Sequence, residues 1–205
     1  MPPTTTSLDR AVTAFQQHRG TLRMGEALRE GINRYTLHKM VETGLAERLS
    51  RGLYRLTELP EVGNPDLVTV AGRVPGGVIC LISALSFHDI TTQIPHQVMI
   101  ALNHELVSHP PRIEYPPIRV FWFGEEAFRA GVEVHEIDGF PVRIYSPEKT
   151  IADCFKYRHK IGLGVAVEAL RLFREGHDFR ANVLLEFARV CRVQNVMMPY
   201  LEALL

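Results

Sequence analysis

The chain has 205 residues, of which 46% are hydrophobic and 22% charged, values typical of a globular protein with one or two domains. Its 23 Lys and Arg residues equal its 23 Asp and Glu residues, which excludes a uniformly basic chain that coats nucleic acid. No apolar stretch reaches the roughly 20 residues of a membrane span, and the polar start of the chain has no apolar signal core. We therefore expect a cytoplasmic protein without a membrane partner.

Three helices are expected near the start of the chain, where residues 1–60 carry nine basic and six acidic side chains. Apolar residues at helical spacing predict a first helix that Gly20 ends and a second helix over 22–30, which Gly31 breaks. Asn33 is a typical N-cap residue and predicts the start of the third helix.

Two short strands are expected next, over 45–49 and 53–56. The turn between them contains a glycine suited to a tight hairpin, in the run Ser50, Arg51 and Gly52. A break in composition follows at Pro60, Gly63, Asn64 and Pro65. We therefore expect a first domain of residues 1–60 and a second domain of residues 61–205.

The third helix has the pattern of a DNA recognition helix. Its apolar residues Leu37, Met40 and Val41 share one face, and long polar side chains share the opposite face. Such a face reaches base edges in the major groove, and an arginine-tipped hairpin suits a wing on the DNA backbone. The candidate DNA-binding residues are Asn33, Arg34, Tyr35, Thr36, His38, Lys39, Arg48, Arg51 and Arg55. The alternative interpretation is a solvated amphipathic helix with ordinary surface charges.

The second domain alternates strands and helices and then becomes helical. Strands are expected over 77–81, 96–102, 118–123, 132–137 and 142–145, the last two as a hairpin around Asp138 and Gly139. Helices are expected over 66–74, 83–88 and 125–130, and Ser146 and Pro147 open the helical C-terminal third. The expected fold class is α+β or α/β: a winged helix-turn-helix followed by an α/β domain with a mixed sheet and a helical C-terminal part.

Charged side chains concentrate where this helical part begins. Lys149, Asp153 and Lys156 fall on one helix face, so Asp153 can pair with both lysines. One interpretation is a structural set of ion pairs with a solvated basic end. The other is a patch for nucleic acid or an acidic partner, formed by Lys149, Lys156, Arg158, His159 and Lys160.

Catalytic and metal-binding patterns are not expected. The histidines at 88, 96, 104 and 109 lack the i, i+4 spacing of a helical metal pair, and the three cysteines form no C-x-x-C motif. Glu133, Glu136 and Asp138 are able to hold a cation, but the lysine common in metal-dependent nucleases is missing. The aromatic residues Phe121, Trp122 and Phe123 favour a buried strand. We therefore expect no enzyme activity, no metal and no cofactor.

Two segments resemble the AbiEi-type transcriptional regulators, which are the antitoxins of a bacterial toxin–antitoxin class. The first consists of Gly31–Arg48 with Arg51–Arg55. The second, Ser146–Gly162, is similar to the segment that opens the helical C-terminal part of that family. The resemblance implies that the first domain binds operator DNA and represses its own operon. It also implies that the second domain opposes a nucleotidyltransferase-like toxin.

Together these patterns predict a DNA-binding transcriptional regulator and, through the resemblance, an autorepressing antitoxin. Its expected partners are double-stranded operator DNA and a cognate toxin, with direct contact to the toxin left open. Two alternatives remain at this point. One is a stand-alone regulator whose second domain senses a ligand or dimerises, and the other is a nuclease-like enzyme with a DNA-binding head. The sequence identifies neither the operator sequence nor the oligomeric state.

Overall fold

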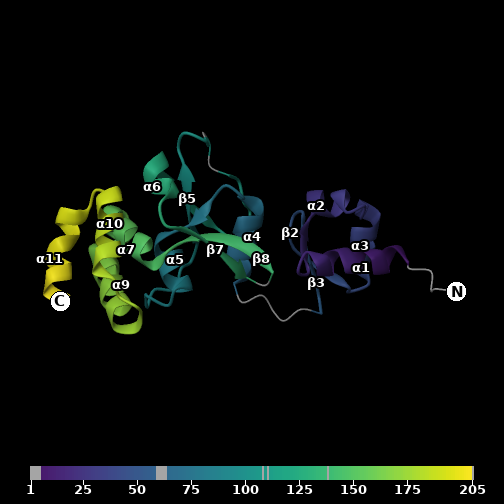
Figure 1. Ribbon diagram of the computed structural model, residues 1–205. Helices are drawn as coiled ribbons and strands as arrows, with labels where there is room; N and C mark the ends of the chain where they lie inside the picture. The colour runs from purple at the N-terminus through teal and green to yellow at the C-terminus, as the bar shows by residue number, and fades with distance from the viewer. Residues whose placement is uncertain (1–5, 59–63, 108, 110, 138, 205) are drawn as a thin grey trace. The chain divides into compact units, whose positions relative to one another are not determined.

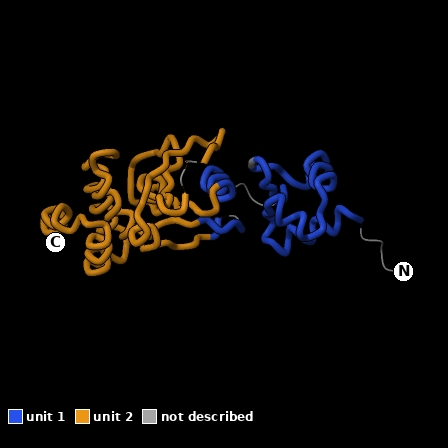
Figure 2. Tube along the Cα trace, turned by 90° about the horizontal axis from the view of Figure 1, so that it is seen from above, with its two compact units in different colours: residues 1–73, 136–142 blue, residues 74–135, 143–205 orange. Residues whose placement is uncertain are grey.

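The computed structural model describes residues 6–58, 64–107, 109, 111–137 and 139–204 (Figure 1). The chain divides into two compact units, one of residues 1–73 with 136–142 and the other of residues 74–135 with 143–205 (Figure 2). The expected boundary at residue 60 lies outside the described residues. The fold is mixed α and β, with one antiparallel and one mixed sheet, as the sequence predicted.

The first unit combines helices with a three-stranded antiparallel sheet. Its elements are α1 (Ser7–Gln17), β1 (Thr21–Arg23), α2 (Met24–Arg29), α3 (Arg34–Glu42), β2 (Ala46–Ser50), β3 (Leu53–Leu56) and α4 (Pro65–Arg73). The sheet order is β1-β3-β2, so β3 is the central strand. Helices α1 and α3 pack together over a core that includes Phe15, Leu37 and Met40.

The expectation of one helix over 22–30 is wrong at its start. Thr21, Leu22 and Arg23 pair with the central strand β3, so the chain stays extended until α2 begins at Met24. A run of three residues is too short for its hydrophobic period to separate strand from helix. Pairing with β3, which is distant in sequence, therefore determines the extended conformation of Thr21–Arg23.

The start of α3 is fixed by its cap and by the preceding glycine. The side-chain oxygen of Asn33 accepts hydrogen bonds from the backbone N–H and the hydroxyl of Thr36, at 2.8 and 3.0 Å, which confirms the expected N-cap. Gly31 has a φ of +78°, where a side chain strains the backbone. A Cβ at Gly31 meets no atom within 4 Å, so the backbone turn alone requires this glycine.

The second unit holds most of a five-stranded mixed sheet. In spatial order its strands are β6 (Ile118–Phe123), β5 (Val98–Asn103), β4 (Val78–Ile79), β8 (Phe140–Tyr145) and β7 (Val132–Ile137). Strand β5 runs parallel to β6 and antiparallel to β4, and β4 runs parallel to β8. Strand β7 is therefore an edge strand of the sheet.

The helices of the second unit include one, α7, that is almost entirely buried. They are α5 (Leu81–Phe87), α6 (Glu125–Arg129), α7 (Pro147–Lys156), α8 (Arg158–Ile161), α9 (Leu163–Gly176), α10 (Ala181–Val190) and α11 (Gln194–Leu204). Helix α7 contacts α5, α9 and α10, and its residues 148–155 are all buried. Ser146 caps α7 and Pro147 lies in its first turn, as predicted. In the described parts of the chain, no helix has the length and apolar character needed to cross a membrane.

Candidate nucleic-acid interface

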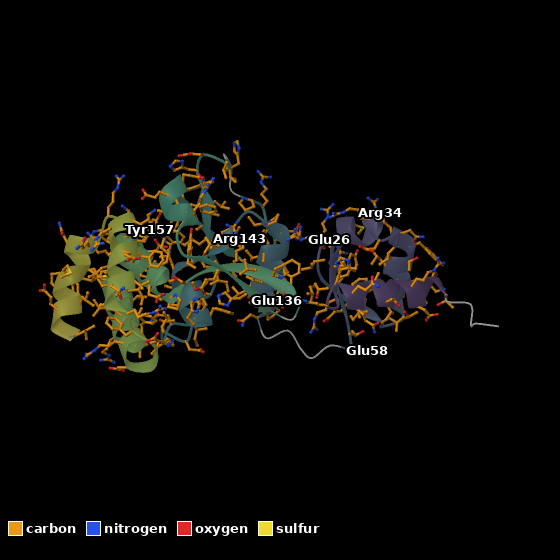
Figure 3. The ribbon with its side chains drawn as sticks, viewed as in Figure 1. Glu26, Arg34, Glu58, Glu136, Arg143 and Tyr157 are labelled. Atoms are coloured by element: carbon orange, nitrogen blue, oxygen red, sulfur yellow. The ribbon has the colours of Figure 1, made fainter. Side chains whose placement is uncertain are left out.

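The face of α3 that points away from the core carries the polar residues selected from the sequence. Leu37 and Met40 on the inner face are buried, with exposed fractions of 1% and 0%. Arg34, the first residue of the helix, is exposed and is labelled in Figure 3. The other exposed members of this face are Tyr35, His38 and Lys39. The structure therefore places polar and aromatic side chains on one accessible helix face.

The charges on this face differ in their internal partners. The Nε2 atom of His38 lies 3.3 Å from Oε1 of Glu42, one helical turn further on. Arg34 and Lys39, by contrast, form no ion pair with any residue that the structure describes. Both side chains are exposed, so an anion outside the chain can reach their positive charges.

Two of the selected residues serve the helix itself. Thr36 is buried, and both of its donors are bound to the side-chain oxygen of Asn33. Thr36 is therefore not accessible to DNA, which corrects its selection as a contact. Asn33 is exposed, and its side-chain nitrogen forms no hydrogen bond with the described residues, so it stays accessible while its oxygen caps α3.

The hairpin of β2 and β3 turns at Arg51 and Gly52. Gly52 has a φ of +82°, which supports the tight turn expected there. The register of the two strands shifts between Arg48 and Ser50, which marks a bulge close to the tip. Arg48 and Arg51 are both exposed. The tip thus has the exposed basic side chains that the sequence analysis assigned to a wing.

Arg55 does not share this exposure, which corrects its selection as a DNA contact. Its side chain is 2% exposed, and Nη1 lies 3.2 Å from Oε1 of Glu47 on the neighbouring strand. The reason is the position of β3 at the centre of the sheet, where every residue of the strand is buried. A phosphate outside the chain cannot reach this guanidinium.

The basic cluster of the second unit contains one buried lysine. Lys149 is 0% exposed, its Nζ lies 2.6 Å from Oδ2 of Asp153, and the same Nζ lies 4.1 Å from the ring centroid of Tyr145. The thiol of Cys191 donates a hydrogen bond to the other oxygen of Asp153 at 3.2 Å. Burial raises the pKa of the Asp153 carboxyl, and the neighbouring Lys149 opposes this shift. Lys149 therefore belongs to the core, which corrects its place in the partner patch.

The remaining basic residues of the cluster lie around the end of α7 and on α8. Lys156, His159 and Lys160 are exposed, whereas Arg158 is half-buried and donates from Nη1 to the backbone oxygen of Phe155 at 3.0 Å. Asp153 was expected to pair with both lysines of its helix face. It pairs with Lys149, and Lys156 has no ion pair among the described residues.

A cavity of about 450 Å³, which no pattern in the sequence indicated, lies beside Lys156. Its lining includes Trp122, Glu125, Asp153, Lys156 and Tyr157. Trp122 was expected in the core but is 38% exposed, while its neighbours in β6, Phe121 and Phe123, are buried. The period of two along a strand was the signal that separates the tryptophan from the other two rings.

Residues 9–57 match the model of a family described as transcriptional regulator, AbiEi antitoxin. This match confirms the resemblance of the first segment, whereas Ser146–Gly162 lies outside the matched residues. The fold is similar to the crystal structure of the RV2827C protein from Mycobacterium tuberculosis, with a TM-score of 0.52 and 13% identity over 98% of this chain and 84% of that chain. No curated protein matches the chain.

Proposed function

We propose that the chain is a DNA-binding transcriptional regulator whose residues 6–58 form a winged helix-turn-helix. Helices α2 and α3 are the helix-turn-helix, and the β2–β3 hairpin is the wing. The observation that carries the proposal is the exposed face of α3, where Arg34 and Lys39 have no ion pair among the described residues. The family match over residues 9–57 supports a role as a regulator.

In this proposal helix α3 and the wing contact different parts of the DNA. Helix α3 enters the major groove, where Arg34 in its first turn binds base edges and Lys39, further along the helix, binds phosphate. The positive end of the helix dipole also favours a phosphate near the N-terminus of α3. Arg51 at the tip of the wing contacts the DNA backbone and adds affinity without reading sequence. No step in this function requires catalysis or a cofactor, and a cytoplasmic location gives the protein access to its DNA.

The proposal is tested by titrating the full chain against duplex DNA from the region upstream of its own gene. A gel-shift assay at fixed salt compares this DNA with a scrambled duplex of the same length and composition. A specific regulator binds its own site at least about 1,000-fold more tightly than unrelated DNA. Equal affinity for the two duplexes contradicts autoregulation through this region.

We further propose that the second unit opposes a nucleotidyltransferase-like toxin, as the resemblance of Ser146–Gly162 implies. The structural support is a group of exposed basic residues, Lys156, His159 and Lys160, of which Lys156 also lines the cavity. Positive side chains attract acidic or phosphate-bearing partners and accelerate their encounter. Lys156 and Lys160 carry this proposal, because Arg158 also holds the end of α7 through its bond to Phe155.

Co-expression with a toxin encoded beside the gene tests this second role. The full chain is expected to restore growth, and the Lys156→Ala, Lys160→Ala double variant is expected to lose this rescue. The matched control is Arg174→Ala with Arg189→Ala, which removes the same charge from exposed sites on α9 and α10. Full rescue by the lysine variant excludes these two side chains from the antitoxin activity.

A further inference from the structure

Three potential metal ligands lie together at the edge of the large sheet. Glu133 and His135 are two residues apart on β7, so they point to the same side of this strand. His88 is the C-cap of α5. One ligand atom from each of the three side chains lies within 4.8 Å of the other two. None of the three takes part in the functions proposed above.

The hydrogen bond of His88 prepares its ring for metal binding. Its Nε2 lies 2.8 Å from the backbone oxygen of Tyr145. Because a carbonyl oxygen only accepts, Nε2 carries the proton and Nδ1 of the neutral ring keeps its lone pair. Metal-bound histidines commonly donate their second N–H to a backbone carbonyl in this way.

The other two ligands are already close to the spacing that a metal ion imposes. Nε2 of His135 lies 2.9 Å from Oε2 of Glu133. Two ligands bound about 2.0 Å from a tetrahedral zinc ion lie about 3.3 Å apart. The ring of Phe87 makes edge contacts with both imidazoles, at centroid distances of 5.2 Å to His88 and 4.9 Å to His135. These contacts restrict the rings before any ion arrives.

We propose that His88, Glu133 and His135 bind a divalent transition-metal ion of the zinc class, with water in the fourth position. Two imidazoles and one carboxylate are a common zinc ligand set. The hard cations Mg²⁺ and Ca²⁺ prefer oxygen ligands throughout, and two of these three ligands are nitrogen atoms. The competing account is a metal-free hydrogen bond between the side chains of His135 and Glu133.

Metal titration of the tag-free full chain separates these accounts. Zn²⁺ binding is followed by calorimetry, and Co²⁺ serves as a spectroscopic probe because its visible absorption reports a site of low coordination number. The expected result is one ion per chain, with the Co²⁺ absorption removed by added Zn²⁺. His135→Ala is expected to weaken binding by more than about 100-fold, since the loss of even an outer partner costs 10- to 100-fold.

Two controls make the result specific. His96→Ala and His104→Ala remove exposed histidines outside the cluster and are expected to bind Zn²⁺ as the unmodified chain does. Glu133→Gln is a second disruptive variant, which removes the carboxylate with little change of shape. Thermal unfolding of each metal-free variant shows whether that variant is folded. The absence of stoichiometric binding by the unmodified chain overturns the site. Equal affinity in folded His135→Ala or Glu133→Gln overturns it as well.

Discussion

At the start of α3, Asn33 caps the helix and also faces outward, and two substitutions separate these roles. Asn33→Ala removes the acceptor for both donors of Thr36 and is expected to reduce the free energy of unfolding by about 1 kcal/mol. Asn33→Asp keeps a cap of equal quality, so its stability should match that of the unmodified chain. It also places a carboxylate where we propose that phosphates bind. We expect at least about tenfold weaker DNA binding from this like-charge contact.

Urea unfolding measures the stability of both Asn33 variants, and a DNA titration at fixed salt measures their affinity. Asn33→Ser is the neutral control, since serine also caps helices but adds no charge. If the stable Asn33→Asp variant binds DNA as well as Asn33→Ser does, the N-terminus of α3 does not face the DNA.

Lys149 and Asp153 show how far a sequence determines individual residues. Their spacing of four predicted the ion pair correctly, because this relation lies within one helix. Their burial was not predictable, because it comes from residues on other elements: Tyr145 on β8, Phe123 on β6 and Cys191 after α10. The same limit applies to Arg55, which lies on a central strand that no local pattern identifies.

At the scale of elements, segments with strong local signals were predicted best. Helix α3 has a capping asparagine, and α7 has a capping serine followed by proline; both helices begin where the sequence indicated. Strand β1 was missed because its conformation comes from pairing with β3, which is distant in sequence. The exposed position of Trp122 depends on which face of β6 the core covers, and three consecutive aromatic residues hid the alternation.

The wing makes a prediction about salt dependence. Each phosphate contact contributes about 0.9 to the slope of log affinity against log salt. Arg51→Ala is therefore expected to reduce the magnitude of this slope by about one and to weaken binding to all duplexes equally. DNA titrations at several salt concentrations measure the slope, with Arg174→Ala in the second unit as the charge-matched control. A loss of affinity for the preferred duplex alone shows instead that Arg51 reads bases.

At the scale of the whole molecule, the sequence indicated the fold class but not the order of the strands. The order β6-β5-β4-β8-β7 brings residues together that are far apart in the chain. The cluster likewise joins His88, at the end of α5, to Glu133 and His135 on β7, so spacing within a single helix did not indicate it. The family match covers residues 9–57 alone. The proposals for the second unit therefore depend on the side chains of that unit and on the resemblance of Ser146–Gly162.

The central claim is that the outer face of α3 binds DNA, and one comparison tests it most directly. Fluorescence anisotropy measures the affinity of two full-length double variants for the upstream duplex. One combines Arg34→Ala with Lys39→Ala on α3, and the control combines Arg174→Ala with Arg189→Ala. Both variants lose two positive charges, so a general effect of charge changes them equally. Loss of one bidentate base contact costs about 1–3 kcal/mol, so we predict at least about fivefold weaker binding for the α3 variant and a much smaller change for the control. Equal affinities of the two folded variants contradict the account.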